Sequence, residues 1–328
     1  MTTEGAEEAA PRLLWQTRDG TAVQQCDLIC PAKAIPLVQS ADHLLQHNVC
    51  IRFKASKRLT KDQMNPISLP AWPYPRWVAH RGAGKLAPEN TLAAFRLGAS
   101  HGYRMFECDV KLSADGVPFL LHDAELERTT NAADKLGAGS NDVSDIAGDH
   151  PWSTLSQLDA GSWHSRAYAG EPLPPFEAIA RYCIGNSLFL NIEIKPTPGT
   201  ELFTGAVVAQ HAARLWNGVA VPPLLTSFDI PALEGALTAQ PELPRGLLID
   251  ALEGQAWSAW LDKAQALQCQ AIVCNHELWN AETVAQAKER GFRTLSYTVN
   301  DAAEAERLLV LGTDAVITDR VDLFSPAS

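Results

Sequence analysis

Polar side chains that could do chemistry stand inside or directly after short apolar stretches of this chain. The pair His80-Arg81 follows the run WVA, and His122 follows FLL. Glu107 and Asp109 stand two residues apart in MFECDVKL. Because alternate residues of a strand share one face, we expect these two carboxylates on the same side, roughly 6 to 7 Å apart along the chain. They could share one cation.

A further acid and a further base stand together in FLNIEIK. The same alternation places Glu193 and Lys195 on one side of an expected strand. Oxygen ligands from Glu and Asp suit a hard cation such as Mg²⁺ or Ca²⁺ better than Zn²⁺. Two histidines suit paired acid and base work, and an arginine and a lysine beside a cation can hold a phosphate group. The combination indicates phosphoryl transfer or phosphodiester cleavage.

Each of these features also has a simpler structural interpretation. A single His at a strand end is more often a hydrogen-bonded structural residue, a Glu-x-Asp pair can be a solvated face, and a Glu-x-Lys pair can be a surface ion pair worth less than about 1 kcal/mol. However, three acids, two histidines, an arginine and a lysine inside otherwise apolar strands would be costly if they faced a core unpaired. Convergence on one polar site accounts for all of them together.

The elements that must position these residues repeat along the chain. Short apolar runs alternate with Ala-rich amphipathic stretches from Trp77 onward. Strands are expected at 77–80, 105–112, 188–195, 224–228, 246–250, 271–275, 294–299 and 315–318, and helices at 90–100, 176–183, 203–216, 230–239, 256–267, 281–290 and 302–311. Strands that alternate with helices form a parallel sheet, and eight such units over about 250 residues close most simply into an α/β TIM (β/α)8 barrel. An open doubly wound sheet is the alternative.

One connection in this pattern is much longer than the others. Residues 123–175 are rich in Gly, Ser, Asp and Asn and contain no long periodic segment. Long irregular segments in compact domains are usually functional. We expect a small insertion here, after the second strand region, that covers the barrel mouth.

The first 71 residues differ from the rest of the chain. Residues 1–63 show no sustained helix or strand period, and the following thirteen residues, MNPISLPAWPYPR, hold four prolines. We expect an N-terminal extension and a Pro-rich linker over 1–71, followed by the barrel over 72–328. Met64 opens the linker and could be the true start.

Composition excludes several classes of protein. The 328 residues are 46% hydrophobic and carry a net charge of −11, so a large core is expected and nucleic acid is disfavoured as a partner. No apolar run reaches the length of a membrane span, and the acidic start lacks signal-peptide features, so a cytoplasmic location is expected. Seven scattered cysteines are expected to be reduced thiols.

A few other residues have two interpretations. His276 either lines the pocket or begins a helix, and Phe228 is either a wall for a glycerol chain or, more commonly at such a position, a core residue. Asp319 closes the last strand and is expected to be a cap, whereas Trp152 and Trp163 are expected to pack the insertion. The spacing of Cys26, Cys30, His43 and His47 fits a zinc finger by count, but prolines interrupt the segment and disfavour this module.

Three segments in this order resemble the glycerophosphodiester phosphodiesterase family: VAHRGAGKLAPENTLAAF, ECDVKLSADGVPFLLHDAELERTTN and NIEIKP. The combination of WPYPR, VAHRG, DAGSW and ELPRGLL resembles the bacterial cytosolic branch of that family. The resemblance runs from about Trp72 to Leu323. Any one motif alone is weak, but their order and spacing make the match specific.

The resemblance implies a role for each site residue. Glu107, Asp109 and Glu193 would be the ligands of one divalent cation, Mg²⁺ or Ca²⁺. His80 and His122 would be the general acid/base pair.

The resemblance also implies a set of substrate-binding residues. Arg81 would contact the phosphate, and Lys195 would lie beside it. Many family members have Trp where this chain has Tyr297, so an aromatic ring is kept near the glycerol or the leaving group. Independently of the resemblance, Phe228 at the end of the fourth expected strand is a candidate wall for the glycerol chain.

The implied activity is metal-dependent hydrolysis of glycerophosphodiesters to sn-glycerol 3-phosphate and an alcohol. Because such a substrate carries a free glycerol hydroxyl next to the esterified one, we expect the reaction to pass through a cyclic phosphate. The expected partners are small-molecule glycerophosphodiesters, with neither nucleic acid nor stable membrane insertion. Two alternatives stay open. A lysophospholipase D-type phosphodiesterase on the same scaffold would need an apolar channel, and a non-catalytic phosphate-binding protein would lack turnover.

Overall fold

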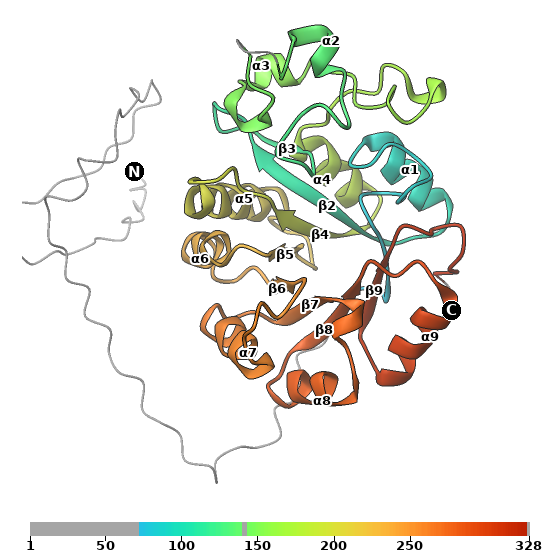
Figure 1. Ribbon diagram of the computed structural model, residues 1–328, viewed down its shortest axis with the longest axis vertical. Helices are drawn as coiled ribbons and strands as arrows, with labels where there is room; N and C mark the ends of the chain where they lie inside the picture. The colour runs from blue at the N-terminus through green and yellow to red at the C-terminus, as the bar shows by residue number, and fades with distance from the viewer. Residues whose placement is uncertain (1–71, 140–142, 327–328) are drawn as a thin grey trace, which may run out of the picture. The chain divides into compact units, whose positions relative to one another are not determined.

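The computed structural model describes residues 72–139 and 143–326, and these contain every predicted site residue (Figure 1). The zinc-finger spacing and Met64 lie outside the described residues.

Eight parallel strands form a closed sheet. They are β1 (Trp77–Ala79), β2 (Met105–Leu112), β4 (Phe189–Ile194), β5 (Leu224–Ser227), β6 (Arg245–Ile249), β7 (Ala271–Asn275), β8 (Arg293–Tyr297) and β9 (Ala315–Thr318). Because β1 pairs in parallel with both β2 and β9, the sheet has no break between its first and last strands. The fold is therefore the predicted TIM barrel, and the open-sheet alternative is wrong.

Helices surround the barrel and connect its strands (Figure 1). The longer ones are α1 (Leu92–Ser100), α4 (Phe176–Gly185), α5 (Glu201–Leu215), α6 (Ile230–Ala239), α7 (Trp257–Ala266), α8 (Ala281–Glu289) and α9 (Ala302–Leu311). Several begin at a polar cap: the side chains of Thr91, Asp229, Asn280 and Asp301 accept backbone N–H groups of the first turns of α1, α6, α8 and α9. Such caps satisfy donors that have no partner inside the helix.

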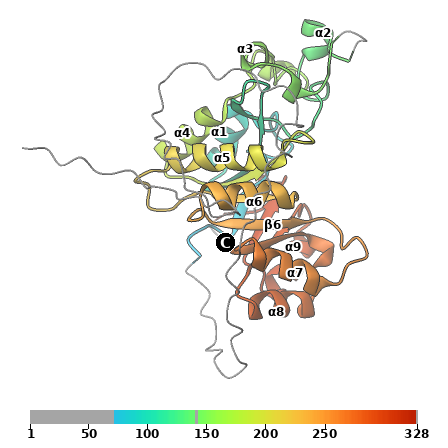
Figure 2. The same ribbon diagram turned by 90° about the vertical axis from the view of Figure 1, so that its left-hand side faces the viewer.

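Close backbone contact joins α5 and α6, which lie side by side in both views (Figure 2). Gly205 and Gly235 form the contact: a Cβ on Gly205 would lie 1.8 Å from the carbonyl oxygen of Ala232, and one on Gly235 would lie 2.1 Å from that of Leu202. Both glycines are needed because a methyl group at either position would collide with the backbone of the neighbouring helix.

The sequence analysis missed one strand. β3 (Pro118–Leu120) pairs antiparallel with β2 after a tight turn that contains Gly116 at φ +80°. The apolar segment is only three residues long and begins with proline, so it carries almost no periodic signal.

The predicted insertion forms a small lobe with its own core. Its short elements are α2 (Ala132–Leu136), η3 (Ala147–Asp149), α3 (Trp152–Leu155) and η4 (Arg166–Tyr168). Leu126, Leu155 and Leu158 belong to its apolar cluster, and Trp152 packs against that cluster as predicted. Trp163 is 39% exposed, so its packing role is only partial.

Two apolar layers explain which strand residues reach the interior. On β2, Phe106, Cys108 and Val110 belong to the layer between the strands and the helices, whereas Met105 belongs to a separate cluster that fills one end of the barrel interior. Alternation then places residues 107 and 109 in the barrel above Met105. None of the helices in the described part of the chain is both long and apolar enough to cross a bilayer.

Candidate active site

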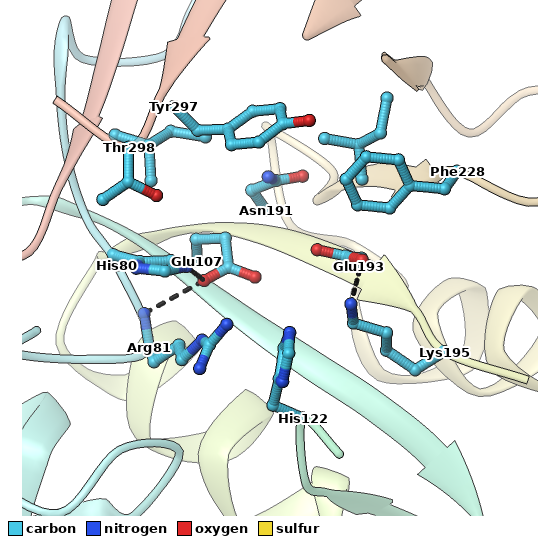
Figure 3. Close-up of a pocket in the computed structure, with 12 residues that line it drawn as sticks. His80, Arg81, Glu107, His122, Asn191, Glu193, Lys195, Phe228, Tyr297 and Thr298 are labelled. Carbon is cyan, nitrogen blue, oxygen red and sulfur yellow. Dashed lines mark hydrogen bonds and ion pairs between the residues drawn. The ribbon is translucent and has the colours of Figure 1, made fainter. Parts of the chain in front are cut away.

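A cavity of about 140 Å³ opens in the barrel where the predicted site residues converge (Figure 3). Its lining residues are His80, Arg81, Glu107, His122, Asn191, Glu193, Lys195, Phe228, Leu248, Tyr297, Thr298 and Ile317. Most of them stand at or just beyond the carboxyl ends of barrel strands, where active sites of this fold lie. Every predicted site residue except Asp109 lines this cavity. Asp109 lies in a cluster with Glu107 and Glu193, which do line it.

Three carboxylates form a buried cluster. Glu107, Asp109 and Glu193 each offer one oxygen, and these oxygens all lie within 4.8 Å of one another. The register of the sheet explains the cluster, because Asp109 on β2 is the direct partner of Glu193 on β4. All three residues are buried, and Glu193, with 8% of its surface exposed, is the most accessible of them.

The three acids of this cluster have like charges when ionised, and their pKa values are shifted in different directions. Burial, together with repulsion from Asp109, raises the pKa of Glu107 to about 8. The pKa of Glu193 is raised for the same two reasons. Burial also disfavours the charge on Asp109, but Arg81 and Lys195 outweigh it and lower the pKa of Asp109 to about 2.

The acidic cluster fits a hard divalent cation. Glu107 Oε1 and Asp109 Oδ1 are buried and have no hydrogen-bond partner within the described ranges. Buried carboxylate oxygens without partners are costly unless a cation or a donor compensates them. An all-oxygen donor set suits Mg²⁺ or Ca²⁺, so these three residues could hold such an ion.

Arg81 reaches the cluster from the loop after β1. Its Nε lies 3.3 Å from Asp109 Oδ2, and its backbone N–H donates to Glu107 Oε2 at 3.0 Å. Its Nη1 donates to Glu89 Oε1 at 2.8 Å. Arg81 has φ +50°, a strained backbone conformation for a non-glycine residue. The strained turn aims both the amide and the guanidinium at the carboxylates.

Lys195 lies on the other side of the cluster. Its Nζ is 2.7 Å from Glu193 Oε1 and 3.8 Å from Asp109 Oδ1. Together with Arg81 it surrounds the acids with positive charge, which an incoming phosphate group could share.

Each of the two histidines is held by a carboxylate through Nδ1. His80 Nδ1 lies 2.7 Å from Asp319 Oδ1, and His122 Nδ1 lies 2.6 Å from Asp123 Oδ1. His80 Nε2 points inward and lies 3.8 Å from Glu107 Oε2. Both rings line the cavity with one nitrogen already engaged.

The environments of the histidines differ. Burial lowers the pKa of His122. Burial also acts to lower the pKa of His80, but the hydrogen bond that His80 donates to Asp319 and the negative charges of Glu107 and Asp319 together outweigh burial and raise this pKa. Arg128 pairs with Asp123 and also donates to Glu89 at 2.7 Å, so the partner of His122 already has an arginine counter-ion.

Asp319 is not the cap that the sequence predicts. Its Oδ1 contacts His80, and its Oδ2 accepts from Asn300 Nδ2 at 3.0 Å. The capping contact after β9 comes instead from Thr318, whose Oγ1 accepts the N–H of Arg320 at 2.9 Å. Both carboxylate oxygens of Asp319 are engaged by other side chains, which explains why Asp319 does not cap the following turn.

Two aromatic rings form one wall of the cavity (Figure 3). Phe228 and Tyr297 meet edge to face at 5.8 Å, and Lys195 Nζ lies 5.5 Å from the Phe228 ring centroid. Phe228 is 40% exposed and lines the cavity, so the expectation that it packs in the core is wrong, and its role as a wall for the glycerol chain stays a prediction. His276 begins the short helix η5 (His276–Leu278), bonds to Glu304 and does not line this cavity.

Sequence reasoning missed several residues of the site. Asn90 donates to Asp109 Oδ2 at 2.8 Å and accepts the Asp109 backbone N–H at 3.1 Å. Asn191 lines the cavity and shares the inward face of β4 with Glu193, so the alternation in FLNIEIK could have found it. Nothing in the local pattern around Asn90 distinguishes it from an ordinary turn residue.

The barrel and the groups at its mouth define an enzyme of the phosphoric diester hydrolase class. Residues 80–323 match the profile of the glycerophosphoryl diester phosphodiesterase family. The chain belongs to this family, which confirms the family resemblance noted in the sequence.

Proteins with similar sequences agree with this family assignment. The chain is 29% identical over 244 residues to a glycerophosphodiester phosphodiesterase of Caldanaerobacter subterraneus, covering 74% of this chain and 93% of that protein. It is 49% identical over 174 residues to the human glycerophosphoinositol inositolphosphodiesterase GDPD2, covering 47% of this chain but only 31% of the human protein.

Solved structures share the fold. An Oleispira antarctica phosphodiesterase, determined in complex with the product sn-glycerol-3-phosphate, is 32% identical with a TM-score of 0.68 and covers 77% of this chain and 97% of its own. The glycerophosphodiester phosphodiesterase of Agrobacterium tumefaciens is 26% identical with a TM-score of 0.61 and covers 77% of this chain and all of its own.

Proposed function

We propose that this protein hydrolyses glycerophosphodiesters to sn-glycerol 3-phosphate and an alcohol, with one divalent cation in the acidic cluster. The observation that carries the proposal is the convergence of three carboxylates, two imidazoles, an arginine and a lysine on one small cavity. The product bound to the Oleispira phosphodiesterase supports the same chemistry.

Glu107, Asp109 and Glu193 are the residues that would hold Mg²⁺ or Ca²⁺. A bound cation supplies positive charge against phosphoryl oxygens and makes a nearby hydroxyl more acidic. Arg81 and Lys195, which already face the same carboxylates, would bind the remaining charge of the phosphodiester.

The substrate brings its own nucleophile, the glycerol hydroxyl next to the esterified one. In the first step, Nε2 of one histidine takes the proton of this hydroxyl as its oxygen bonds to phosphorus. The second histidine donates a proton to the alcohol oxygen as its bond to phosphorus breaks. Water then opens the resulting cyclic phosphate with the two roles reversed, which restores both protonation states. The Nδ1 contacts of His80 and His122 leave Nε2 of each ring available for these transfers.

Phe228 and Tyr297 would bind the organic part of the substrate. Their rings form the apolar wall opposite His80 and His122, next to Lys195 (Figure 3). An apolar ring wall beside a cationic phosphate site suits the carbon chain of glycerol.

A coupled assay for glycerol 3-phosphate tests the proposal. Purified protein is incubated with glycerophosphocholine, glycerophosphoethanolamine or bis(glycerol) phosphate, with Mg²⁺, Ca²⁺ or a chelator. We expect product with at least one cation and none with the chelator. Product that forms equally in the chelator contradicts the cation role. Turnover of lysophospholipids alone replaces the proposal by the lysophospholipase D alternative, and absence of turnover on every substrate favours a binding protein.

The domain organisation is a second part of the proposal. We infer that residues 72–328 are the catalytic unit and that residues 1–71 are an extension. All residues that line the cavity lie between positions 80 and 317, which supports this division.

A further inference from the structure

The carboxylate of Asp319 reaches His80 from the opposite end of the chain. His80 follows β1 and Asp319 follows β9, and these strands are neighbours in the closed barrel, with Ala79 paired to Thr318. The backbone N–H of His80 donates to Thr318 O at 3.0 Å, which brings the two side chains together. The contact between His80 Nδ1 and Asp319 Oδ1 at 2.7 Å is thus a product of barrel closure.

The position of Asp319 is itself fixed by its surroundings. Asn300 donates through Nδ2 to Asp319 Oδ2 at 3.0 Å and accepts the Asp319 backbone N–H through Oδ1 at 2.9 Å. On the other side, the turn after His80 packs directly on the Asp319 backbone, because a Cβ on Gly84 would lie 2.2 Å from Asp319 Cα. The carboxylate is therefore clamped between two loops.

The chemistry of this contact determines which ring nitrogen carries the proton. The hydrogen bonds from His80 and Asn300 outweigh burial and lower the pKa of Asp319 to about 2, so its carboxylate is ionised at neutral pH. An ionised carboxylate can only accept hydrogen bonds. The Nδ1 atom of His80 must therefore be the donor, and Nε2, which faces the cavity, is left with its lone pair in the neutral ring.

We propose that Asp319 is a positioning residue that fixes His80 in the Nδ1–H tautomer with Nε2 directed at the reacting atoms. The effect of Asp319 on turnover rests on the proposed function. The tautomer of His80 is a property of the free protein and can be measured without turnover. Asp319 lines no part of the cavity and acts only through His80. It differs from the partner of His122, which is the adjacent residue in the chain and is paired with Arg128.

The decisive variant is Asp319→Asn. Asparagine has nearly the same shape, but its amide can donate to Nδ1 and so favours the other tautomer, with the proton on Nε2. A loss of about 10²- to 10⁴-fold in kcat is expected, with KM nearly unchanged, because the ring can no longer take or give the proton correctly. Asp319→Glu keeps the carboxylate and is expected to recover part of this loss.

The matched control is Asp301→Asn. Asp301 directly follows Asn300 in the same loop and caps α9 with its side-chain oxygen, a task that asparagine performs equally well. The control changes the charge of this end of the barrel by the same amount, so its kcat is expected to match the wild-type value. An equal loss of kcat in the control overturns the proposal in favour of a general charge effect.

A spectroscopic readout keeps the inference testable without turnover. Nitrogen-15 NMR of His-labelled protein, with the His80 signals assigned through His80→Gln, is expected to show the Nδ1–H tautomer in the wild type and the Nε2–H tautomer in Asp319→Asn. Mg²⁺ affinity measured by calorimetry is expected to be the same in both proteins. An unchanged tautomer, or an unchanged kcat in a folded Asp319→Asn variant, overturns the proposal. If the wild-type protein turns over no glycerophosphodiester, the proposed function fails while the NMR comparison still decides the role of Asp319.

Discussion

The two imidazoles of the cavity lie in different electrostatic surroundings. His122 shares its carboxylate partner with Arg128, whereas the partner of His80 is held by the neutral amide of Asn300. Because Arg128 partly neutralises the carboxylate of Asp123, Asp123 stabilises a proton on His122 less strongly than Asp319 stabilises one on His80. A pair of groups with such unequal surroundings is suited to opposite proton-transfer roles.

Loss of His122 is expected to abolish most of the turnover without unfolding the protein. We predict that His122→Ala lowers kcat by about 10²- to 10⁴-fold, since no other described imidazole lines the cavity beside His80. Its side chain is 31% exposed, so the melting temperature should change little. Steady-state kinetics with a thermal melt measures both quantities, and near-normal turnover would remove His122 from the mechanism.

Cation binding should depend on pH through Glu107. Its pKa of about 8 in the ion-free protein means that this carboxyl is largely protonated at pH 7, whereas a ligand must be ionised. The ion therefore displaces a proton, and its apparent affinity is expected to fall as the pH drops below about 8. Calorimetry at pH 6 and 8.5, in buffers of different ionisation enthalpy, measures the affinity and the protons released. Equal affinity and no proton release would contradict this protonation state.

The residues predicted from the sequence are those that a local strand pattern marks. Strand alternation predicts Glu107 and Asp109, and the position of His122 after an apolar run predicts that residue. Asn90 and Asp319 have no such pattern, because their roles depend on contacts across 19 and 239 residues. Periodicity predicts the face on which a side chain lies, but only the closed barrel decides which faces meet.

At the scale of elements, the loop after β1 connects His80 to the last strand. Gly84 has φ +57° and lies against the Asp319 backbone. We predict that Gly84→Ala destabilises the protein by about 1 to 3 kcal/mol and lowers kcat, because the added methyl group pushes the β9 end away from His80. Chemical denaturation and kinetics measure the two effects.

Gly116→Ala is the matched control for this substitution. Gly116 also has a left-handed backbone, φ +80°, but a Cβ there would meet no atom within 4 Å. It should therefore cost about 1 kcal/mol in conformational strain and leave kcat unchanged. If both variants lose kcat equally, backbone strain and not displacement of Asp319 is the cause.

The main elements were predictable because each barrel unit repeats the same apolar pattern. The exception is β3, whose three residues depend on pairing with β2 for their conformation. Pairing is a tertiary property, so a short edge strand cannot be recognised from its own residues.

For the whole molecule, the acidic cluster links cation binding to stability. Three buried carboxyl groups lie close enough together to share one ion, and an ion that binds only the folded state should raise the melting temperature. At an ion concentration of 100 times Kd, the gain is about 2.7 kcal/mol. Glu193→Gln, which removes one ligand charge, is expected to weaken this gain. Calorimetric melts with and without Mg²⁺ test it, and equal shifts in both proteins would exclude Glu193 as a ligand.

The barrel should not need the extension for its activity. The family profile begins at residue 80, and the described apolar contacts of the barrel interior involve residues from Trp72 onward. A protein that begins at Met64 is therefore expected to keep the kcat and melting temperature of the full chain. A lower kcat or a lower melting temperature in this shorter protein would show that the first 63 residues are part of the catalytic unit.

Strand alternation has a practical consequence at Cys108. This thiol sits between two acidic residues of β2 but faces the helices, is fully buried, and has a pKa raised well above its usual value by that burial. A thiol reagent can reach it only when β2 locally opens. The alkylation rate of Cys108 would therefore report how often β2 opens, and buried Cys274 on β7 serves as the reference. An ion held by residues of β2 and β4 should slow alkylation of Cys108 far more than alkylation of Cys274.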